Sequence, residues 1–287
     1  MYSPPCLVYA PMPCIENLSL KISAFGEISS LKPHLKILGR INTRNSHKRV
    51  IIMKSVLSLL AVCSLVCSSA QALDMAALER AMANSDRPAA DKERDASRQA
   101  PAVLNALGLE AGMTVLDINA SGGWYTEVLS YAVGPNGKVL MQNRPEGRAA
   151  EAATARAGRL SNVDEWLTPI SDISANSVDF AITALNFHDF HNSDPAAAQG
   201  ILAQVMGALK SGGILAVIDH EGTYGADNQT LHRIAFEDAV KAVLESGFAL
   251  AGVSDVLNND ADGHSVGPFD PSLERNTDRI VLKFMKL

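Results

Sequence analysis

The chain has 287 residues and a formal net charge of −6. Its length allows one large domain or two small ones, but the first quarter of the chain differs in character from the rest. That quarter holds all four cysteines, so a disulfide, a thiolate nucleophile or a cysteine-bound metal is excluded from the remainder.

The N-terminal quarter divides at Met53. Residues 1–52 contain five prolines and no sustained helical or strand period, so we predict an over-extended start of translation or a disordered N-terminus there. From Met53 a lysine, an apolar run at 56–66 and the sequence Ala70-Gln71-Ala72 follow, which is the pattern of a signal peptide. The apolar run is shorter than the ~20 residues that span a bilayer, so we expect no stable membrane anchor. Residues 53–72 are therefore interpreted as an export signal, with the periplasm as the destination.

Residues 73–287 form the predicted mature domain. Residues 1–72 hold 8 of the 25 Lys and Arg and 2 of the 31 Asp and Glu, which leaves 17 basic and 29 acidic residues and a net charge near −12. This acidic balance disfavours nucleic acid as a partner. The remaining length suits a single α/β domain with a substantial core.

The apolar pattern of this domain alternates between strand and helix lengths. Residues 73–107 are helical in pattern, divided by Pro88 and Pro101. Strands are predicted at 114–118, 138–142, 163–167, 178–184 and 214–219, with helices such as 149–160 and 196–209 between them. A helix at 235–246 then precedes strands at 249–257 and 279–285, which we expect to form an antiparallel pair. The prediction is a three-layer α/β sandwich with a seven-stranded, mostly parallel sheet and ligand sites at the carboxyl ends of its strands.

A strand, a turn of small residues and a helix start follow one another at 112–126. Such a turn lets a ligand approach the backbone and the helix N-terminal amides. Here the chain resembles the class I S-adenosylmethionine-dependent methyltransferase family, and specifically its exported branch. The resemblance implies a Rossmann-like methyltransferase fold that binds S-adenosylmethionine through Asp117, Asn119, Ser121, Gly122 and Gly123. Two of the family's three alternating glycines are replaced, and Asn119 is expected to keep the turn because asparagine tolerates positive φ.

The resemblance extends over essentially the whole predicted mature chain, through residues 86–92, 134–139, 209–215 and 277–284. In the family an acid after the second strand binds the cofactor ribose, and the aligned residues are the amides Gln142 and Asn143. The resemblance implies that Asn143 contacts the cofactor, that Asp172 lies beside its adenine, and that Asn186 belongs to the same site.

Residues 186–191 follow the fourth predicted strand, at the sheet edge where this fold carries out its chemistry. Methyl transfer to a hydroxyl or ammonium needs a base, and His188 or Asp189 is predicted to serve. The alternative is that His188 caps the next helix or packs beneath the cofactor. A metal held by His188, His191, Asp219 and His220 lacks a tight ligand spacing, so no metal is expected.

Three further features have a structural interpretation beside the functional one. Arg87, Arg94 and Arg98 could line a pocket for an anion, but with nearby acids a solvated helix face is the favoured interpretation. The pair His232-Arg233 resembles the exported branch's own pattern at the start of the penultimate helix, and its structural interpretation is a helix start with exposed polar groups. Trp124 and Tyr125, which open a helix against the sheet, fit either the core or the flank of the cofactor.

Two functions are therefore carried forward. The first is an S-adenosylmethionine-dependent methyltransferase acting on an unidentified small molecule. The second is a catalytically inactive binding protein on the same scaffold, which the altered glycine loop and the missing ribose acid favour. A nicotinamide-dependent oxidoreductase is less favoured, because the G-x-G-x-x-G spacing is absent. The sequence predicts neither the methyl acceptor nor the oligomeric state.

Overall fold

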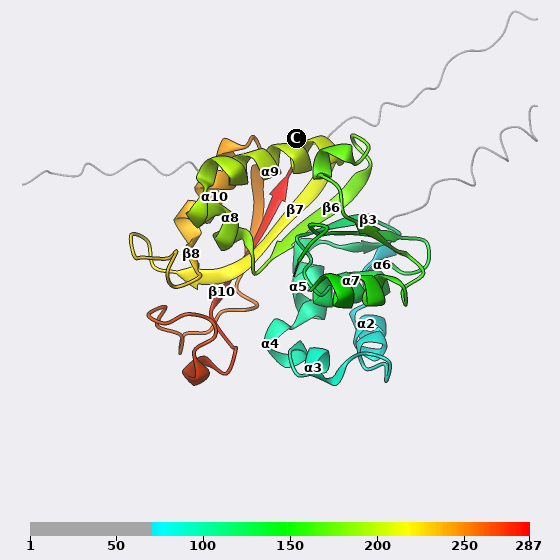
Figure 1. The fold of residues 1–287 in the computed structure, drawn as a ribbon, viewed down its shortest axis with the longest axis horizontal. Coiled ribbons are helices and arrows are strands. Elements are labelled where there is room, and N and C mark those ends of the chain that lie inside the picture. Colours follow the sequence, from blue (N-terminus) through cyan, green and yellow to red (C-terminus); the bar gives the residue numbers. More distant parts are fainter. Residues whose placement is uncertain (1–70, 148) are drawn as a thin grey trace, which may run out of the picture. The chain divides into compact units, whose positions relative to one another are not determined.

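Among the described residues the main sheet has eight strands, one more than predicted, because the two-residue strand β8 (Ile234–Ala235) pairs with the end of β7. The other seven are β3 (Thr114–Ile118), β4 (Lys138–Gln142), β5 (Val163–Trp166), β6 (Val178–Ala184), β7 (Leu209–Gly222), β9 (Ala249–Ser254) and β10 (Arg279–Met285). Their order across the sheet is β5-β4-β3-β6-β7-β10-β9 (Figure 1). The first five in this order are mutually parallel, and β10 is antiparallel to both of its neighbours. The predicted mostly parallel sheet and its closing antiparallel pair are confirmed.

The computed structural model describes residues 71–147 and 149–287, which fall within one unit, Ser68–Leu287. The predictions for residues 1–52 and 53–70 lie outside the described residues. Gln71–Ala72, the last two residues of the predicted signal, form a short strand β1 that pairs with β2 (Glu110–Ala111). No helix within the described ranges has both the length and the apolar character needed to cross a bilayer.

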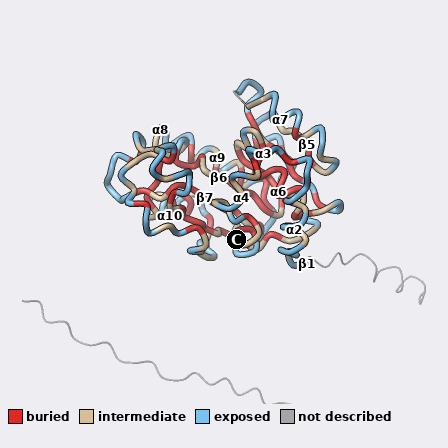
Figure 2. Tube along the Cα trace, turned by 90° about the horizontal axis from the view of Figure 1, so that it is seen from below, coloured by how far each residue is buried: buried red, intermediate tan, exposed pale blue. Residues whose placement is uncertain are grey.

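Helices cover both faces of the sheet because successive strand residues point to opposite sides. Val115 packs on the side of α2 (Met75–Met82), α5 (Ala100–Leu107), α6 (Trp124–Val133) and α7 (Ala150–Ala157). Its neighbour Leu116 packs on the side of α8 (Phe187–Ser193), α9 (Pro195–Ala208) and α10 (Phe236–Glu245). Figure 1 shows these two helix layers, and Figure 2 shows buried residues inside the sheet and exposed ones on the outer turns.

The segment that precedes the sheet is a chain of short helices, as predicted. Pro88 caps α3 (Ala89–Lys92), and α4 (Asp95–Arg98) ends at Gln99, whose φ of 41° is left-handed. Pro101 lies in the first turn of α5, where its missing N–H has no helical partner to lose. The changes of chain direction between these short helices bring α3 and α4 back toward the start of α6, where the Trp124 indole donates to the Asp91 carbonyl.

Strand β7 is longer than the predicted 214–219. Its pairing with β6 starts at Leu209 and resumes at Ile214 after an irregularity, in which Gly212 has a φ of 76°. Beyond Asp219 the strand continues beside β10 and the two-residue strand β8 (Ile234–Ala235). The polar ending of β7 concealed this extension from the apolar pattern.

Candidate functional site

The carboxyl ends of β4, β3, β6 and β7 lie at one edge of the sheet, because these strands are adjacent and parallel. The strand order reverses between β3 and β6, and such a switch point opens a crevice for ligands. A cavity of about 550 Å3 lies there, which we call the loop cavity; its wall includes Asp117, Asn119, Ser121, Gly122, Gly123, Asn186 and Asp189. Seven of the sequence-predicted site residues therefore meet at one cavity.

The loop between β3 and α6 has a left-handed backbone at alternate residues. The φ angles are 50° at Asn119, 53° at Ser121 and 78° at Gly123. These are the positions at which the family has glycine, so the turn persists with side chains at two of them. A Cβ on Gly123 would lie 2.5 Å from the Met141 side chain and 2.9 Å from Arg156, which explains why glycine remains there.

The two amides at the end of β4 hold this loop. The Gln142 Oε1 atom accepts the N–H of Asn119 at 2.9 Å. Asn143 makes two bonds to Ser121: its Oδ1 accepts the backbone N–H at 2.8 Å and its Nδ2 donates to the carbonyl at 3.0 Å. Both amides therefore satisfy loop backbone groups. Asn143 also borders a second cavity of about 660 Å3, the outer cavity, which shares Asn119, Ser121 and Asp189 with the loop cavity.

Asp117 is a buried acid at the end of β3. Its side chain accepts a hydrogen bond from the Thr126 hydroxyl at 2.6 Å and is 2% exposed. Burial raises the pKa of Asp117 to about 7, although the Thr126 bond and the charge of Arg98 act in the opposite direction. The carboxyl is therefore poised between its neutral and charged forms near neutral pH.

Arg98, the last residue of α4, also lines the loop cavity. Its guanidinium carbon lies 4.4 Å from the centre of the Trp124 ring and 5.4 Å from that of Tyr125, within cation–π range. Burial lowers its pKa to about 10, so it stays charged at neutral pH. Within the described ranges its guanidinium makes no side-chain hydrogen bond or ion pair. A charged group without a partner on a cavity wall is suited to an anionic ligand group.

The interpretation of Arg87, Arg94 and Arg98 as a solvated helix face is wrong for two of the three. Arg87 is 2% exposed and makes two bonds to Asp95, at 2.6 and 2.8 Å, and Arg98 packs on aromatic rings. Arg94 remains partly exposed and pairs with Asp91. The sequence missed this because the fold-back of α3 and α4 buries residues that an isolated helix would expose.

A polar cluster extends behind the loop cavity from the end of β6 to the end of β7. Asn186 donates to the backbone carbonyls of Ile118 and Asn119, at 3.3 and 3.2 Å, and so joins the ends of β3 and β6. His188 is 4% exposed, and its Nδ1 lies 2.7 Å from Asp219 Oδ1. Burial lowers the pKa of His188, but the hydrogen bond and charge of Asp219 outweigh it, so the pKa is raised.

The two predicted catalytic residues have different environments. Asp189 is exposed, lines both cavities, and lies 3.2 Å from the Nε2 atom of His188. His188 is near the start of α8, as the structural alternative supposed, and its backbone N–H donates to Asp219. Asp219 was considered from the sequence only as a metal ligand. In the structure it is the residue that orients His188.

The structure does not bring Asp172 to the site. It ends the short helix Ile170–Asp172, is exposed, and borders neither the loop cavity nor the outer cavity. Arg233, predicted to be exposed, is fully buried: its guanidinium makes two 2.9 Å bonds to Asp262 and others to backbone carbonyls. Trp124 and Tyr125 are both buried and also line the loop cavity. They therefore belong to the core and border the predicted cofactor site at the same time.

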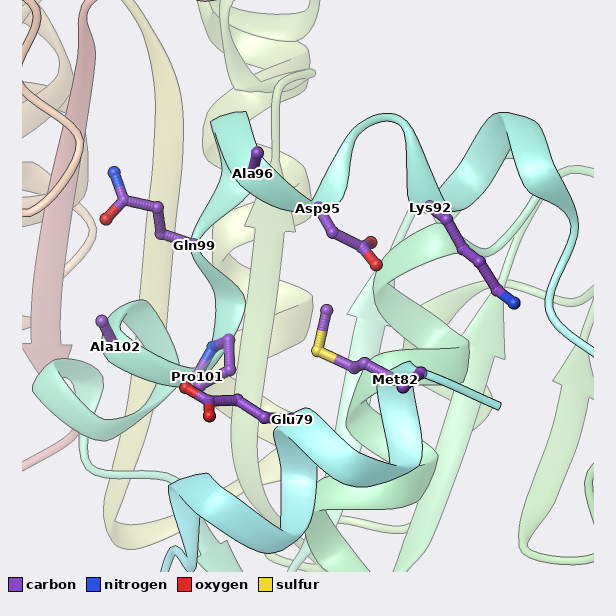
Figure 3. A pocket seen from close by; sticks show the side chains of 9 residues that line it. Glu79, Met82, Lys92, Asp95, Ala96, Gln99, Pro101 and Ala102 are labelled. Atoms are coloured by element: carbon purple, nitrogen blue, oxygen red, sulfur yellow. The ribbon is translucent and has the colours of Figure 1, made fainter. Parts of the chain in front are cut away.

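A separate hollow of about 490 Å3 lies between α2 and the segment from α3 to α5 (Figure 3). Its wall combines Met82 and Pro101 with polar side chains including Glu79, Lys92 and Gln99. It lies among the N-terminal helices, whereas the predicted site residues gather at the strand ends. Asp95 on its wall is already paired with Arg87.

The fold is similar to that of known proteins. A SAM-dependent methyltransferase from Aquifex aeolicus matches with a TM-score of 0.53 and 21% identity over 75% of this chain and 99% of its own. The cyclase SpnF matches with a TM-score of 0.51 and 18% identity over 83% of this chain and 95% of its own. The sequence matches no protein-family model and no curated protein. These similarities establish a Rossmann-like methyltransferase fold, and a fold shared with a cyclase leaves the reaction to the site itself.

Proposed function

We propose that this chain is an exported S-adenosylmethionine-dependent methyltransferase that acts on a small molecule. One observation carries the proposal: the Asp117 carboxyl and the unpartnered Arg98 guanidinium line the same cavity, beside the loop of alternating left-handed residues. The methionine part of S-adenosylmethionine has an α-ammonium and an α-carboxylate. These match Asp117 and Arg98 in charge.

The cavities support the remaining parts of this ligand. The outer cavity, which shares Asn119 and Ser121 with the loop cavity, has a volume typical of ligand sites and would take the nucleoside. On the other side, Phe269, Arg275 and Arg279 contribute to the loop cavity, which favours a small acceptor with an aromatic or anionic part. Asp189, backed by His188 and Asp219, would accept or relay the acceptor's proton.

Binding is tested by titration calorimetry of the full chain with S-adenosylmethionine and with S-adenosylhomocysteine. We expect dissociation constants in the micromolar range, about −8 kcal/mol. The heat should depend on the buffer, because a ligand ammonium favours ionised Asp117 and displaces its proton.

The matched pair Arg98→Ala and Arg80→Ala tests the assignment. Arg98→Ala should weaken binding at least tenfold, whereas Arg80, exposed on α2, should be neutral. Absence of binding to either nucleoside, with the fold intact, would overturn the proposal.

A second function, a binding protein without methyl transfer, is favoured by the end of β4. Gln142 and Asn143 are bonded to the loop, and neither is an acid for a ribose. Tight binding of S-adenosylhomocysteine without methyl transfer to any of a panel of hydroxyl, amine and thiol acceptors would select this alternative.

Export is proposed from residues 53–72 alone. Mass spectrometry of the protein isolated from its natural source should give a chain beginning at Leu73 and lacking cysteine. A chain that retains residue 1 or any of the four cysteines would contradict export with cleavage at this site.

A further inference from the structure

Two imidazoles and a carboxylate converge at the end of β6. Asp189 Oδ1 lies 3.2 Å from His188 Nε2 and 3.1 Å from His232 Nδ1. One ligand atom from each of the three residues lies within 4.8 Å of the others. We propose that His188, Asp189 and His232 bind a divalent transition-metal ion.

The spacing of these atoms suits an ion. Nitrogen and oxygen ligands lie roughly 2.0–2.2 Å from Zn²⁺ in a tetrahedral site, which places neighbouring ligand atoms roughly 3.3 Å apart. The separations from Asp189 Oδ1 to His188 Nε2 and to His232 Nδ1, 3.2 and 3.1 Å, are close to that value. The side chains of Asp189 and His232 are 54% and 55% exposed, so both can adjust around an ion without disturbing the core.

The Nδ1 atom of His188, which faces away from the proposed ion, holds the ring in the orientation that a ligand needs. Asp219 is fully buried, and its carboxylate accepts the backbone N–H of His188 at 2.7 Å and that of His220 at 2.8 Å. The same carboxylate faces His188 Nδ1 at 2.7 Å and places the ring proton there. A carboxylate behind a ligating histidine is the usual arrangement in metal sites, where it fixes the ring and its tautomer.

This arrangement leaves electron pairs facing each other. With its proton on Nδ1, His188 presents the Nε2 lone pair to the Asp189 carboxylate, and two lone pairs repel unless a cation lies between them. A metal ion supplies that cation. A second proton on His188 is the competing explanation, and it requires no metal.

The ligand set indicates the class of ion. Imidazole nitrogens with one carboxylate favour Zn²⁺, Fe²⁺, Co²⁺ or Mn²⁺ over Ca²⁺ and Mg²⁺, which prefer oxygen. Three protein ligands leave positions open, and Asp189 lines both cavities, so an open position can face a bound small molecule.

A role in the reaction rests on the proposed methyl transfer. An acceptor hydroxyl bound to the ion would lose its proton more readily, and Asp189 and His188 would then serve as ligands instead of as the base and its support. Ion binding itself does not depend on the methyl transfer.

The sequence could not identify this set, because His232 lies 44 positions beyond His188 in the chain and has no motif spacing to it. Its φ of 51° turns the chain just before β8, which pairs with the end of β7. The fold therefore brings His232 to the cluster. The proposed ligands include Asp189 and His232 in place of His191, Asp219 and His220, which were considered from the sequence.

The test uses the full chain after removal of metals with EDTA. Titration with Co²⁺ should give visible d–d bands that saturate at one equivalent, and Zn²⁺ should displace Co²⁺. His232→Ala and Asp189→Asn should each weaken Co²⁺ binding at least tenfold, and Asp219→Asn by about 10–100-fold, as for other supporting carboxylates.

His191→Ala is the matched control, because His191 lies on the same helix with its Nδ1 3.2 Å from Asn192, outside the cluster. It should leave Co²⁺ binding unchanged, and circular dichroism should show every variant folded. Absence of Co²⁺ and Zn²⁺ binding at millimolar concentration, or full binding by His232→Ala, would overturn the site in favour of a doubly protonated His188. Either result stands apart from the nucleoside titration, which needs no metal.

Discussion

The buried carboxyl of Asp117 makes the stability of the domain depend on pH. Its pKa is about 7 in the folded chain and about 3.9 when unfolded, so between these values the folded state holds a proton that the unfolded state has lost. The free energy of unfolding therefore falls as pH rises through this window, by up to about 4 kcal/mol at 1.36 kcal/mol per pKa unit. The groups that face Asp117 are the Thr126 hydroxyl and the Arg98 guanidinium, and both limit the effect.

Asp117→Asn should remove this dependence, because the amide is neutral throughout and can still accept from Thr126. Urea unfolding of both proteins near pH 5 and near pH 8 measures it. The decline in stability between the two pH values should be smaller in the variant. An equal decline would show that Asp117 is ionised throughout.

The loop residue Ser121 offers a second prediction. A left-handed backbone costs a non-glycine residue roughly 1–2 kcal/mol, and glycine costs about 0.5–1 kcal/mol in chain entropy, so Ser121→Gly should stabilise the domain by roughly 0.5 kcal/mol. It also removes a side chain that borders both cavities, so affinity for S-adenosylmethionine should rise.

Ser121→Ala is the control, because it removes the hydroxyl and keeps the Cβ that makes the backbone costly. Its stability should stay below that of Ser121→Gly in thermal unfolding. If alanine raises affinity as much as glycine does, the hydroxyl and not the backbone limits binding.

At the scale of elements, a buried ion pair anchors the loop between β9 and β10 to the start of β8. Arg233 and Asp262 are both almost fully buried, and the remaining guanidinium nitrogens donate to the carbonyls of Val266 and Glu221. This loop includes Phe269 and Arg275 of the loop cavity wall. The pair therefore links the packing of the last strands to the site.

Arg233→Ala should destabilise the domain by about 3–5 kcal/mol, since it leaves the Asp262 carboxylate buried without its partner. Arg233→Lys should recover only part of this, because an ammonium cannot reproduce the planar fork. Lys241→Ala is the comparison: its pair with Glu245 is exposed and 3.9 Å long, and its loss should cost under ~1 kcal/mol. Chemical denaturation gives the three values, and an Arg233→Ala cost as small as that of Lys241→Ala would contradict the anchoring role.

At the scale of the whole domain, the strand and helix alternation was sufficient to predict the layers and the bounds of six strands to within three residues, whereas β7 is longer than predicted. The strands β3, β4 and β6 are short, nearly continuous apolar runs that are buried on both faces, and runs of this length between helical patterns are visible in the sequence. Contacts between distant segments leave no such signal. The contact of Asp219 with His188 and the amides that bind the loop depend on which strand ends become neighbours, and the burial of Arg87 depends on the fold-back of α3 and α4. The sequence therefore indicated residues for the site without the residues that they contact.

The same kind of distant contact joins the N-terminal helices to the rest of the domain. Arg156 on α7 donates to Asp91 on α3 at 2.6 Å, to Glu127 on α6, and to the Gly122 carbonyl at 2.6 Å. Trp124 adds a bond from its indole N–H to the Asp91 carbonyl at 2.9 Å. These bonds hold α3 and α4 over the loop cavity.

Arg156→Ala should therefore lower the free energy of unfolding by about 3–5 kcal/mol, because the buried carboxylates lose a shared cation. The loss should be uneven, since Glu127 keeps Arg159 at 3.0 Å, whereas Asp91 on α3 loses its ion pair with α7 and keeps only its neighbour Arg94. Hydrogen exchange should accelerate most in α3 and α4 and least in β6. Lys138→Ala, which breaks an exposed pair with Asp164, should change neither pattern. Uniform acceleration across the domain would mean that the network stabilises the whole fold and does not specifically hold the N-terminal helices in place over the site.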